Sequence, residues 1–153
     1  MSDNSNTCGQ PLKNEGLSKA GILRGHDVFQ KIMKNPVVFS GKYLKAFADI
    51  SRTGLNDSSK SPLFTSKVKV GFIVAKRRVR KAVQRNRIKR LMKEDYRRFK
   101  ATDNFIDDEM SLIFSLTDHG YEFFRLKTGI KSGIFANDLI LISGKIVASQ
   151  KKS

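Results

Sequence analysis

The chain has no tryptophan, one cysteine and two histidines among its 153 residues. Cys8 alone cannot form a disulfide within the chain, which is typical of proteins in a reducing compartment. With so few Cys and His residues, a zinc site is not expected. His26 and His119 lie far apart and have no nucleophile pattern beside them. We therefore expect no catalytic residue and no metal bound by the protein alone.

Long apolar runs are also missing. No stretch approaches the roughly 20 apolar residues that span a bilayer, and the N-terminus has no apolar signal core. A helix that lies in a membrane surface needs an apolar face, commonly with tryptophan. The sequence therefore predicts a cytoplasmic protein that does not bind membranes. It also contains no glycine-rich phosphate loop and no Ser/His/Asp order typical of a self-sufficient enzyme.

Acidic residues are scarce, with 14 Asp and Glu against 30 Lys and Arg. Between Lys76 and Lys100, 13 Lys and Arg face only Glu94 and Asp95, which gives about +11 (13 minus 2) of the formal net charge of +16. Charge of this density repels itself unless a polyanion neutralises it. A nucleic acid is therefore the expected partner.

Hydrophobic periodicity predicts one mixed α/β (α+β) domain at 17–148 between a disordered tail at 1–16 and a basic tail at 149–153. A loop at 51–66 and an acidic linker at 101–109 interrupt it. The expected elements, in chain order, are a helix near 27–34, a strand within 37–50 with a shorter strand at 37–40 as an option, a strand at 67–76, a basic helix at 84–99, a strand at 110–116 and a helix within 121–147.

Local composition adds detail to this order. His119 and Gly120 predict a turn, and Gly129, Gly133 and Gly144 weaken the last helix. In the strand at 67–76, Gly71 leaves a flat spot that another chain could approach closely. Alternate residues of that strand should face the core: Val68, Val70, Phe72 and Val74.

At 100° per residue, the basic helix has two faces. The residues of its apolar face, which should pack on the sheet, are Ile88, Leu91, Met92, Tyr96 and Phe99. The residues of its polar face are Asn86, Lys89, Arg90, Lys93, Arg97 and Lys100. A solvated surface normally mixes charges of both signs, whereas this face has no acid near its centre. Ala82 and Val83 fall on the polar side, so the start of the helix should pack against something else.

The order of motifs in the basic region is specific. A strand ends in a small residue followed by Lys and Arg, an Ala-Val step follows, and Arg-Asn-Arg precedes Lys-Arg. The residues are Ala75-Lys76-Arg77, Ala82-Val83, Arg85-Asn86-Arg87 and Lys89-Arg90. In this order the chain closely resembles the protein subunit of bacterial ribonuclease P, densely over about twenty-five residues and more weakly from Leu17 to Leu116.

The resemblance implies an α-β-β-β-α-β-α order with a left-handed crossover through the basic helix, a rare handedness. It implies that a large RNA subunit, which holds most of the Mg²⁺, cleaves the bond between the 5′ leader and tRNA. The protein would have no catalytic side chain and no obligate protein partner. The residues expected to bind the catalytic RNA are Lys76, Arg77, Arg78, Arg80, Lys81, Arg85, Asn86, Arg87, Lys89, Arg90 and Lys93.

The resemblance also places the leader of precursor tRNA in a cleft between the first helix and the sheet. Phe29 and Phe47 match leader-contact positions, and Met33 replaces an aromatic residue of the first helix. Lys45 and Lys69 could add charge, since single-stranded RNA binds aromatic platforms near cations. Packing in the core is the alternative role for the two Phe residues and for Met33. For Met33, the sequence favours core packing over contact with the leader.

Two other functions are compatible with the composition. A structural ribosomal protein would share the charge and the small α/β fold, but the Arg-Asn-Arg motif directly behind a strand favours ribonuclease P. An independent nuclease would need a cluster of carboxylates or histidines on the sheet, and the sequence indicates none.

Overall fold

The computed structural model describes residues 21–49, 68–101 and 110–152. The predicted tail at 1–16 and loop at 51–66 lie outside the described residues, as does nearly all of the predicted acidic linker. The elements are α1 (His26–Lys34), β1 (Val37–Ser40), β2 (Leu44–Asp49), β3 (Val68–Phe72), α2 (Ala82–Ala101), β4 (Met110–Leu116), α3 (Asp118–Leu126) and α4 (Ala136–Lys151). The predicted α+β class is confirmed, with one helix more than the predicted order.

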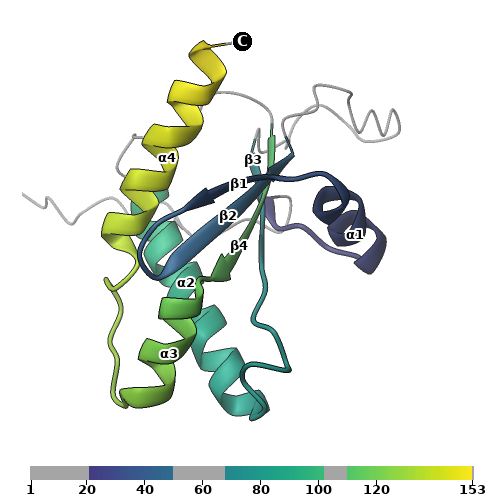
Figure 1. Cartoon of the computed structure of the whole chain (residues 1–153). Coiled ribbons are helices and arrows are strands. Elements are labelled where there is room, and N and C mark those ends of the chain that lie inside the picture. Colours follow the sequence, from purple (N-terminus) through teal and green to yellow (C-terminus); the bar gives the residue numbers. More distant parts are fainter. Residues whose placement is uncertain (1–20, 50–67, 102–109, 153) are drawn as a thin grey trace, which may run out of the picture.

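The four strands form one mixed sheet in the order β1-β2-β4-β3. β2 lies antiparallel to both β1 and β4, whereas β3 lies parallel to β4. Helix α2 connects these two parallel neighbours, and the left-handed sense of this crossover stays a prediction. Figure 1 shows α1 on one side of the sheet and α2 and α4 on the other, with α3 beyond the end of the sheet.

The larger core lies between the sheet and the pair α2 and α4. In β3 and just after it, every second residue is buried there, as the alternation predicts: Val68, Val70, Phe72 and Val74. The helices contribute the buried residues Ile88, Met92, Tyr96, Phe99, Leu139, Ile142 and Ile146. Burial raises the pKa of the Tyr96 hydroxyl. Each large apolar side chain buried in this way stabilises the fold by about 1.5–3 kcal/mol, so the core fixes α2 against the sheet.

A smaller core under α1 consists of Leu23, Ile32 and Ile113. The ring of Phe29 packs against it and covers Gly71, where an added Cβ would lie 2.6 Å from Phe29 Cζ. The prediction that Gly71 offers space to another chain is therefore wrong. The glycine accommodates a side chain of its own protein, and this contact seats α1 on the sheet.

The strand predicted within 37–50 is two strands joined by a tight turn, so the optional short strand at 37–40 is confirmed. The buried carboxylate of Asp138, in the first turn of α4, holds this turn. Its oxygens accept hydrogen bonds from the backbone N–H groups of Lys42 (3.1 Å), Tyr43 (2.7 Å) and Leu44 (2.9 Å). A Cβ at Gly41 would lie 2.7 Å from Asp138 Cγ, so glycine lets the turn approach the carboxylate closely.

The predicted turn at His119 and Gly120 is wrong, because both residues lie in the first turn of α3. Thr117 caps this helix, and its hydroxyl accepts a hydrogen bond from Gly120 N at 3.1 Å. The carbonyl oxygen of Tyr43 occupies the place that a Cβ of residue 120 would take. Glycine therefore allows a close approach of two backbones and does not mark a turn.

The expected C-terminal helix is in fact two helices with a connection between them. Gly129 and Gly133 have φ of 71° and 100°, values that favour glycine, and both lie in this connection. Gly144 lies inside α4 without a close neighbour. Helix α4 continues past residue 148 to Lys151, so the first residues of the predicted basic tail are helical.

Candidate nucleic-acid interface

The basic loop, residues 76–81, joins β3 to α2 and is held by Arg85. The guanidinium of this half-buried residue donates hydrogen bonds from Nη1 to the carbonyl oxygens of Val79 (2.9 Å) and Arg80 (2.6 Å). The predicted RNA contact Arg85 thus already has a structural role. It folds the loop back onto the first turns of α2, so that loop and helix present their cations together.

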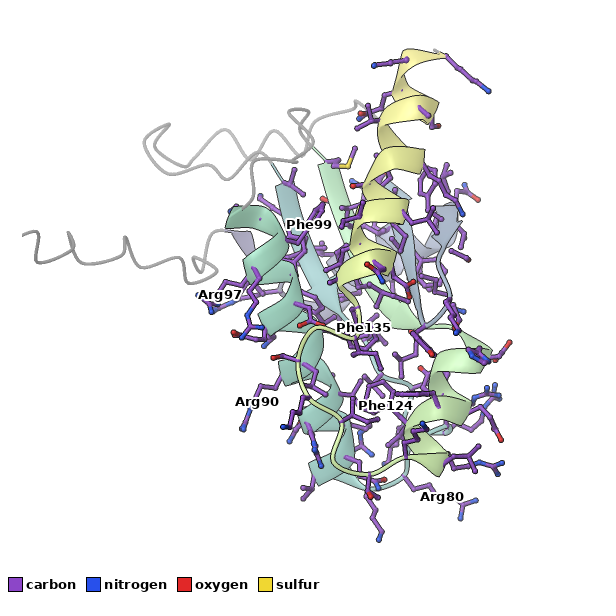
Figure 2. All side chains as sticks on the ribbon, turned by 90° about the vertical axis from the view of Figure 1, so that its left-hand side faces the viewer. Arg80, Arg90, Arg97, Phe99, Phe124 and Phe135 are labelled. Atoms are coloured by element: carbon purple, nitrogen blue, oxygen red, sulfur yellow. The ribbon has the colours of Figure 1, made fainter. Side chains whose placement is uncertain are left out.

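The outer face of α2 follows the basic loop along the chain. Its candidate residues Asn86, Arg87, Arg90 and Lys93 are exposed, and Lys89 is half-buried. In Figure 2 the labelled Arg90 and Arg97 project away from the sheet, on the side of α2 opposite to Phe99. The apolar stripe and the opposite cationic face are both as the helical spacing predicts.

The start of α2 differs from its prediction. Val83 is 81% exposed, and no described residue covers it. The expectation that this end of the helix packs against another part of the fold is not met within the described residues.

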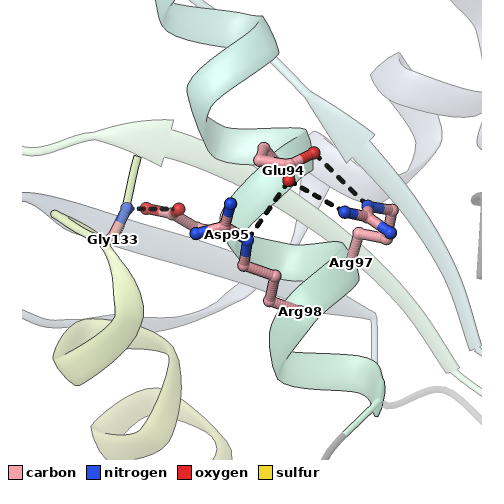
Figure 3. Close-up of polar contacts among 5 residues, drawn as sticks. All are labelled: Glu94, Asp95, Arg97, Arg98 and Gly133. Atoms are coloured by element: carbon pink, nitrogen blue, oxygen red, sulfur yellow. Dashed lines mark hydrogen bonds and ion pairs between the residues drawn. The ribbon is translucent and has the colours of Figure 1, made fainter. Parts of the chain in front are cut away.

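Figure 3 shows polar contacts of Glu94 and Asp95, the two acids of the basic stretch. Glu94 accepts hydrogen bonds from Arg97 (2.8 Å to Nη2) and Arg98 (3.2 Å to Nε). The hydrogen bond from Arg97, helped by the charges of both arginines and opposed by desolvation, holds the pKa of Glu94 below its usual value. Glu94 thus offsets charge near the end of α2. Within the described residues, no acid makes an ion pair with Lys89, Arg90 or Lys93.

Asp95 points the other way, into the protein. Its carboxylate is buried and accepts hydrogen bonds from the backbone N–H groups of Gly133 (2.6 Å) and Phe135 (2.9 Å). It therefore fixes the connection between α3 and α4 to α2. The sequence contained a signal for this role, because residue 95 lies three positions after Met92 and four before Phe99, on the buried stripe.

The structure brings Phe29 and Phe47 to the same side of the sheet, under α1. Phe47 pairs with Ile113 across β2 and β4, and Ile113 pairs with Gly71, over which Phe29 lies. Both rings are half-buried against the small core. The two predicted leader contacts therefore share one surface, and each also contributes to packing.

The two predicted cations lie on the same side of the sheet as Phe47. Lys45 Nζ lies 5.5 Å from the centroid of the Phe47 ring. Lys69 faces the same side, in the row of paired residues that runs through Ser111 to Asp49. Asp49 at the end of this row lowers the positive charge around Lys69. Of the two cations, Lys45 is the one that contacts the Phe47 ring.

Two further aromatic or apolar residues differ from expectation. Met33 is 41% exposed, so the core alternative for it is wrong, and the buried neighbour is Ile32. Alternation along a strand within 37–50 would place Tyr43 on the same face as Phe47, but Tyr43 precedes β2 and turns to α3. Its ring centroid lies 5.3 Å from that of His119 and 4.8 Å from that of Phe123.

In the part of the chain that the structure describes, no three His, Cys, Asp or Glu side chains come together as a metal site requires. None of the described helices has the length and apolar character to cross a membrane.

The fold is that of ribonuclease P proteins. The solved ribonuclease P protein from Thermotoga maritima superposes with a TM-score of 0.57 over 80% of this chain and 94% of that chain, at 20% identity. At this identity the likeness concerns the fold alone.

The sequence itself gives the family. The family model described as Ribonuclease P matches residues 17–128, and the chain belongs to this family. Proteins named ribonuclease P protein component are 36% identical to it over 90 residues in Nitrosomonas europaea and 36% over 109 residues in Chlorobium phaeobacteroides. These matches cover 59% and 71% of this chain, and 66% and 64% of the relatives, just under two thirds of their length. Nothing in them supports a structural ribosomal protein.

Proposed function

We propose that this chain is the RNA-binding protein subunit of ribonuclease P, which acts with a catalytic RNA to remove the 5′ leader from precursor tRNA. The observation that carries this proposal is the cationic face of α2 in a member of the family. Lys89, Arg90 and Lys93 lie side by side on one helical face, and no described acid pairs with them. A phosphate backbone neutralises such a face and releases counterions on binding.

Charge alone would suit any polyanion, but the Arg-Asn-Arg motif adds specific chemistry. Arg87 presents a planar guanidinium that can bind phosphate with two hydrogen bonds or stack on a base. Asn86, exposed beside it, offers both a donor and an acceptor to a base or sugar edge. Arg85 keeps the basic loop beside both residues through its bonds to Val79 and Arg80. The motif therefore combines a rigid loop with exposed recognition groups.

The chemistry of cleavage belongs to the RNA in this proposal. Mg²⁺ bound mainly by the RNA subunit would activate the water and stabilise the leaving oxygen. The protein would bind the RNA, offset repulsion between phosphates of the two RNAs and orient the leader.

Cleavage assays test this division of labour. The protein alone should not cleave precursor tRNA at any Mg²⁺ concentration, whereas addition of a bacterial ribonuclease P RNA should give cleavage at the end of the leader. The measurement is the release of labelled leader over time. Cleavage by the protein after nuclease treatment of the preparation would contradict the proposal.

We further propose that the 5′ leader binds on the α1 side of the sheet. Phe47 and Phe29 offer aromatic surface there, and Lys45 stands over the Phe47 ring. Exposed Met33 on α1 can add a weaker apolar contact. Aromatic rings beside cations bind single-stranded RNA with little regard to sequence.

Replacement of Phe47 with alanine should weaken binding of precursor tRNA by about 1–3 kcal/mol, the usual loss for one stacked base. Mature tRNA has no leader, so its affinity should hardly change. The measurement is the affinity of the reconstituted enzyme for both tRNA forms.

Two matched variants separate stacking from core packing. Phe47→Leu keeps an apolar side chain against the small core but cannot stack, so it should lose as much leader affinity as the alanine variant. Ile140→Ala changes an exposed apolar residue of α4, on the other side of the sheet, and it should affect neither tRNA form. Equal losses for both tRNA forms, with a lower melting temperature, would assign Phe47 to the core.

A further inference from the structure

A cavity of about 540 Å³ opens where the basic loop and the first turns of α2 meet α3. Residues of α3 and of the connection that follows it form the second wall. Seven Lys and Arg side chains line the cavity, against one acid, Glu122. Two of the seven, Arg125 and Lys127, come from outside the basic stretch between residues 76 and 100.

Direct contacts tie the two walls together. The Tyr121 hydroxyl oxygen accepts a hydrogen bond from Ala75 N at 3.0 Å. The Arg78 guanidinium lies 5.0 Å from the centroid of the Tyr121 ring. Arg87 Nη2 on α2 donates a hydrogen bond to the carbonyl oxygen of Ile130, in the connection after α3, at 3.3 Å. In Figure 2 the labelled Phe124 lies between α3 and α2. The cavity is thus built before any ligand arrives.

Little of the cationic charge in this cavity is compensated by the protein. Glu122 pairs with Arg125 at 2.5 Å, but both side chains are more than half exposed, so solvent screens the pair. Arg78 pairs with Asp118, which is almost fully exposed. Arg80 and Lys81 make no ion pair within the described residues. Cations gathered from three segments repel one another, so an anionic occupant would be bound favourably.

The size of the cavity indicates what kind of anion fits. At about 540 Å³ it lies in the range of sites that hold a whole small molecule, and it exceeds the volume of a single phosphate group. Tyr121 and Phe124 are among the lining residues, and aromatic side chains suit sugars or bases, while the cations suit phosphates. A segment of RNA strand offers both.

We propose that this cavity binds phosphates of an RNA strand, and that Arg125 and Lys127 extend the RNA-binding surface of α2 onto α3. The identity of the RNA as the ribonuclease P RNA rests on the proposed function. Free phosphate would offer the same chemistry without a strand, and the experiment distinguishes the two.

The test is the variant Arg125→Gln with Lys127→Gln, both at exposed positions. Affinity for the catalytic RNA is measured over a salt series from about 50 to 400 mM. Loss of two phosphate contacts should make the fall of log affinity with log salt less steep, by about 1.4–1.8 in slope. At 0.1 M salt, affinity should fall about 25- to 60-fold. The charge-matched control, Lys151→Gln with Lys152→Gln at the end of α4, should leave the slope unchanged.

The outcomes separate this inference from the proposed function. Unchanged slope in the cavity variant, with normal binding by the wild-type protein, overturns the cavity inference alone. Failure of the wild-type protein to bind the catalytic RNA overturns the proposed function. Inorganic phosphate is the second probe, and its binding is monitored through the NMR chemical shifts of Arg125 and Lys127. Saturation of these shifts by phosphate, together with unchanged RNA affinity in the variant, would assign the cavity to free phosphate and contradict the inference.

Discussion

Replacement of Asp138 with alanine should lower the free energy of unfolding by about 3–5 kcal/mol, the largest effect we expect from one substitution. Three backbone N–H groups, of Lys42, Tyr43 and Leu44, would lose their acceptor at once. An unsatisfied buried donor costs about 1–3 kcal/mol, and water can reach the two partly buried ones. Urea unfolding followed by circular dichroism measures the loss.

A control on the neighbouring helix separates this effect from the loss of a charge. Asp118→Ala removes an acid that is 93% exposed and pairs only with Arg78 among the described residues. Its cost should stay at or below about 1 kcal/mol, as for exposed ion pairs. Asp138→Asn keeps one acceptor oxygen and should fall between the two. Equal destabilisation by the two alanine variants would show that Asp138 does not hold the β1–β2 turn.

The largest functional effect should come from the outer face of α2. The triple change of Lys89, Arg90 and Lys93 to alanine should make the fall of log affinity for the catalytic RNA with log salt less steep, by about 2.1–2.7 in slope. At 0.1 M salt this corresponds to an affinity loss of about 130- to 500-fold. Alanine is the best helix former, so α2 should persist. Filter binding over a salt series gives both quantities.

A second triple variant has the same net charge. Lys145 on α4 donates a hydrogen bond to the carbonyl oxygen of Ser40 in β1, and Lys151 and Lys152 lie exposed at the end of α4. Their change to alanine removes three cations outside α2 and should leave the salt slope nearly unchanged. If both triple variants lose affinity equally, binding depends on net charge alone. The proposal that the α2 face is a specific surface would then be wrong.

Periodic features of the fold could be predicted from the sequence because they depend on local geometry. Val68, Val70 and Phe72 alternate as a strand with one buried face requires, and they are buried. Met92 and Tyr96 recur at helical spacing, and they face the core. In such segments the residue spacing alone determines which side chains meet the sheet.

Contacts between distant segments could not be predicted in this way. Phe29 meets Gly71 across 42 positions (71 minus 29), and nothing in either segment indicates the other. Likewise, Tyr43 turns to His119 because Asp138 bends the chain before β2. Local patterns do not encode which loop a buried carboxylate will reach.

The candidate site also combines a feature set by local residue spacing with one that depends on contacts between distant segments. The cationic face of α2 follows from one helix, and the family resemblance points to its partner. The cavity beside it needs Arg125 and Lys127, which look like ordinary surface residues in the sequence. They join the basic loop because Tyr121 holds α3 to Ala75, just after β3, and Asp95 holds the connection after α3 to α2.

If this chain supplies cations to a catalytic RNA, it should change the Mg²⁺ concentration for half-maximal cleavage of precursor tRNA by a bacterial ribonuclease P RNA. Addition of the protein should lower this concentration, because its cations offset repulsion between phosphates. The variant changed at Lys89, Arg90 and Lys93 should lower it less at equal protein concentration. An Mg²⁺ requirement that the wild-type protein leaves unchanged, although it binds the RNA, would contradict this role of its cations.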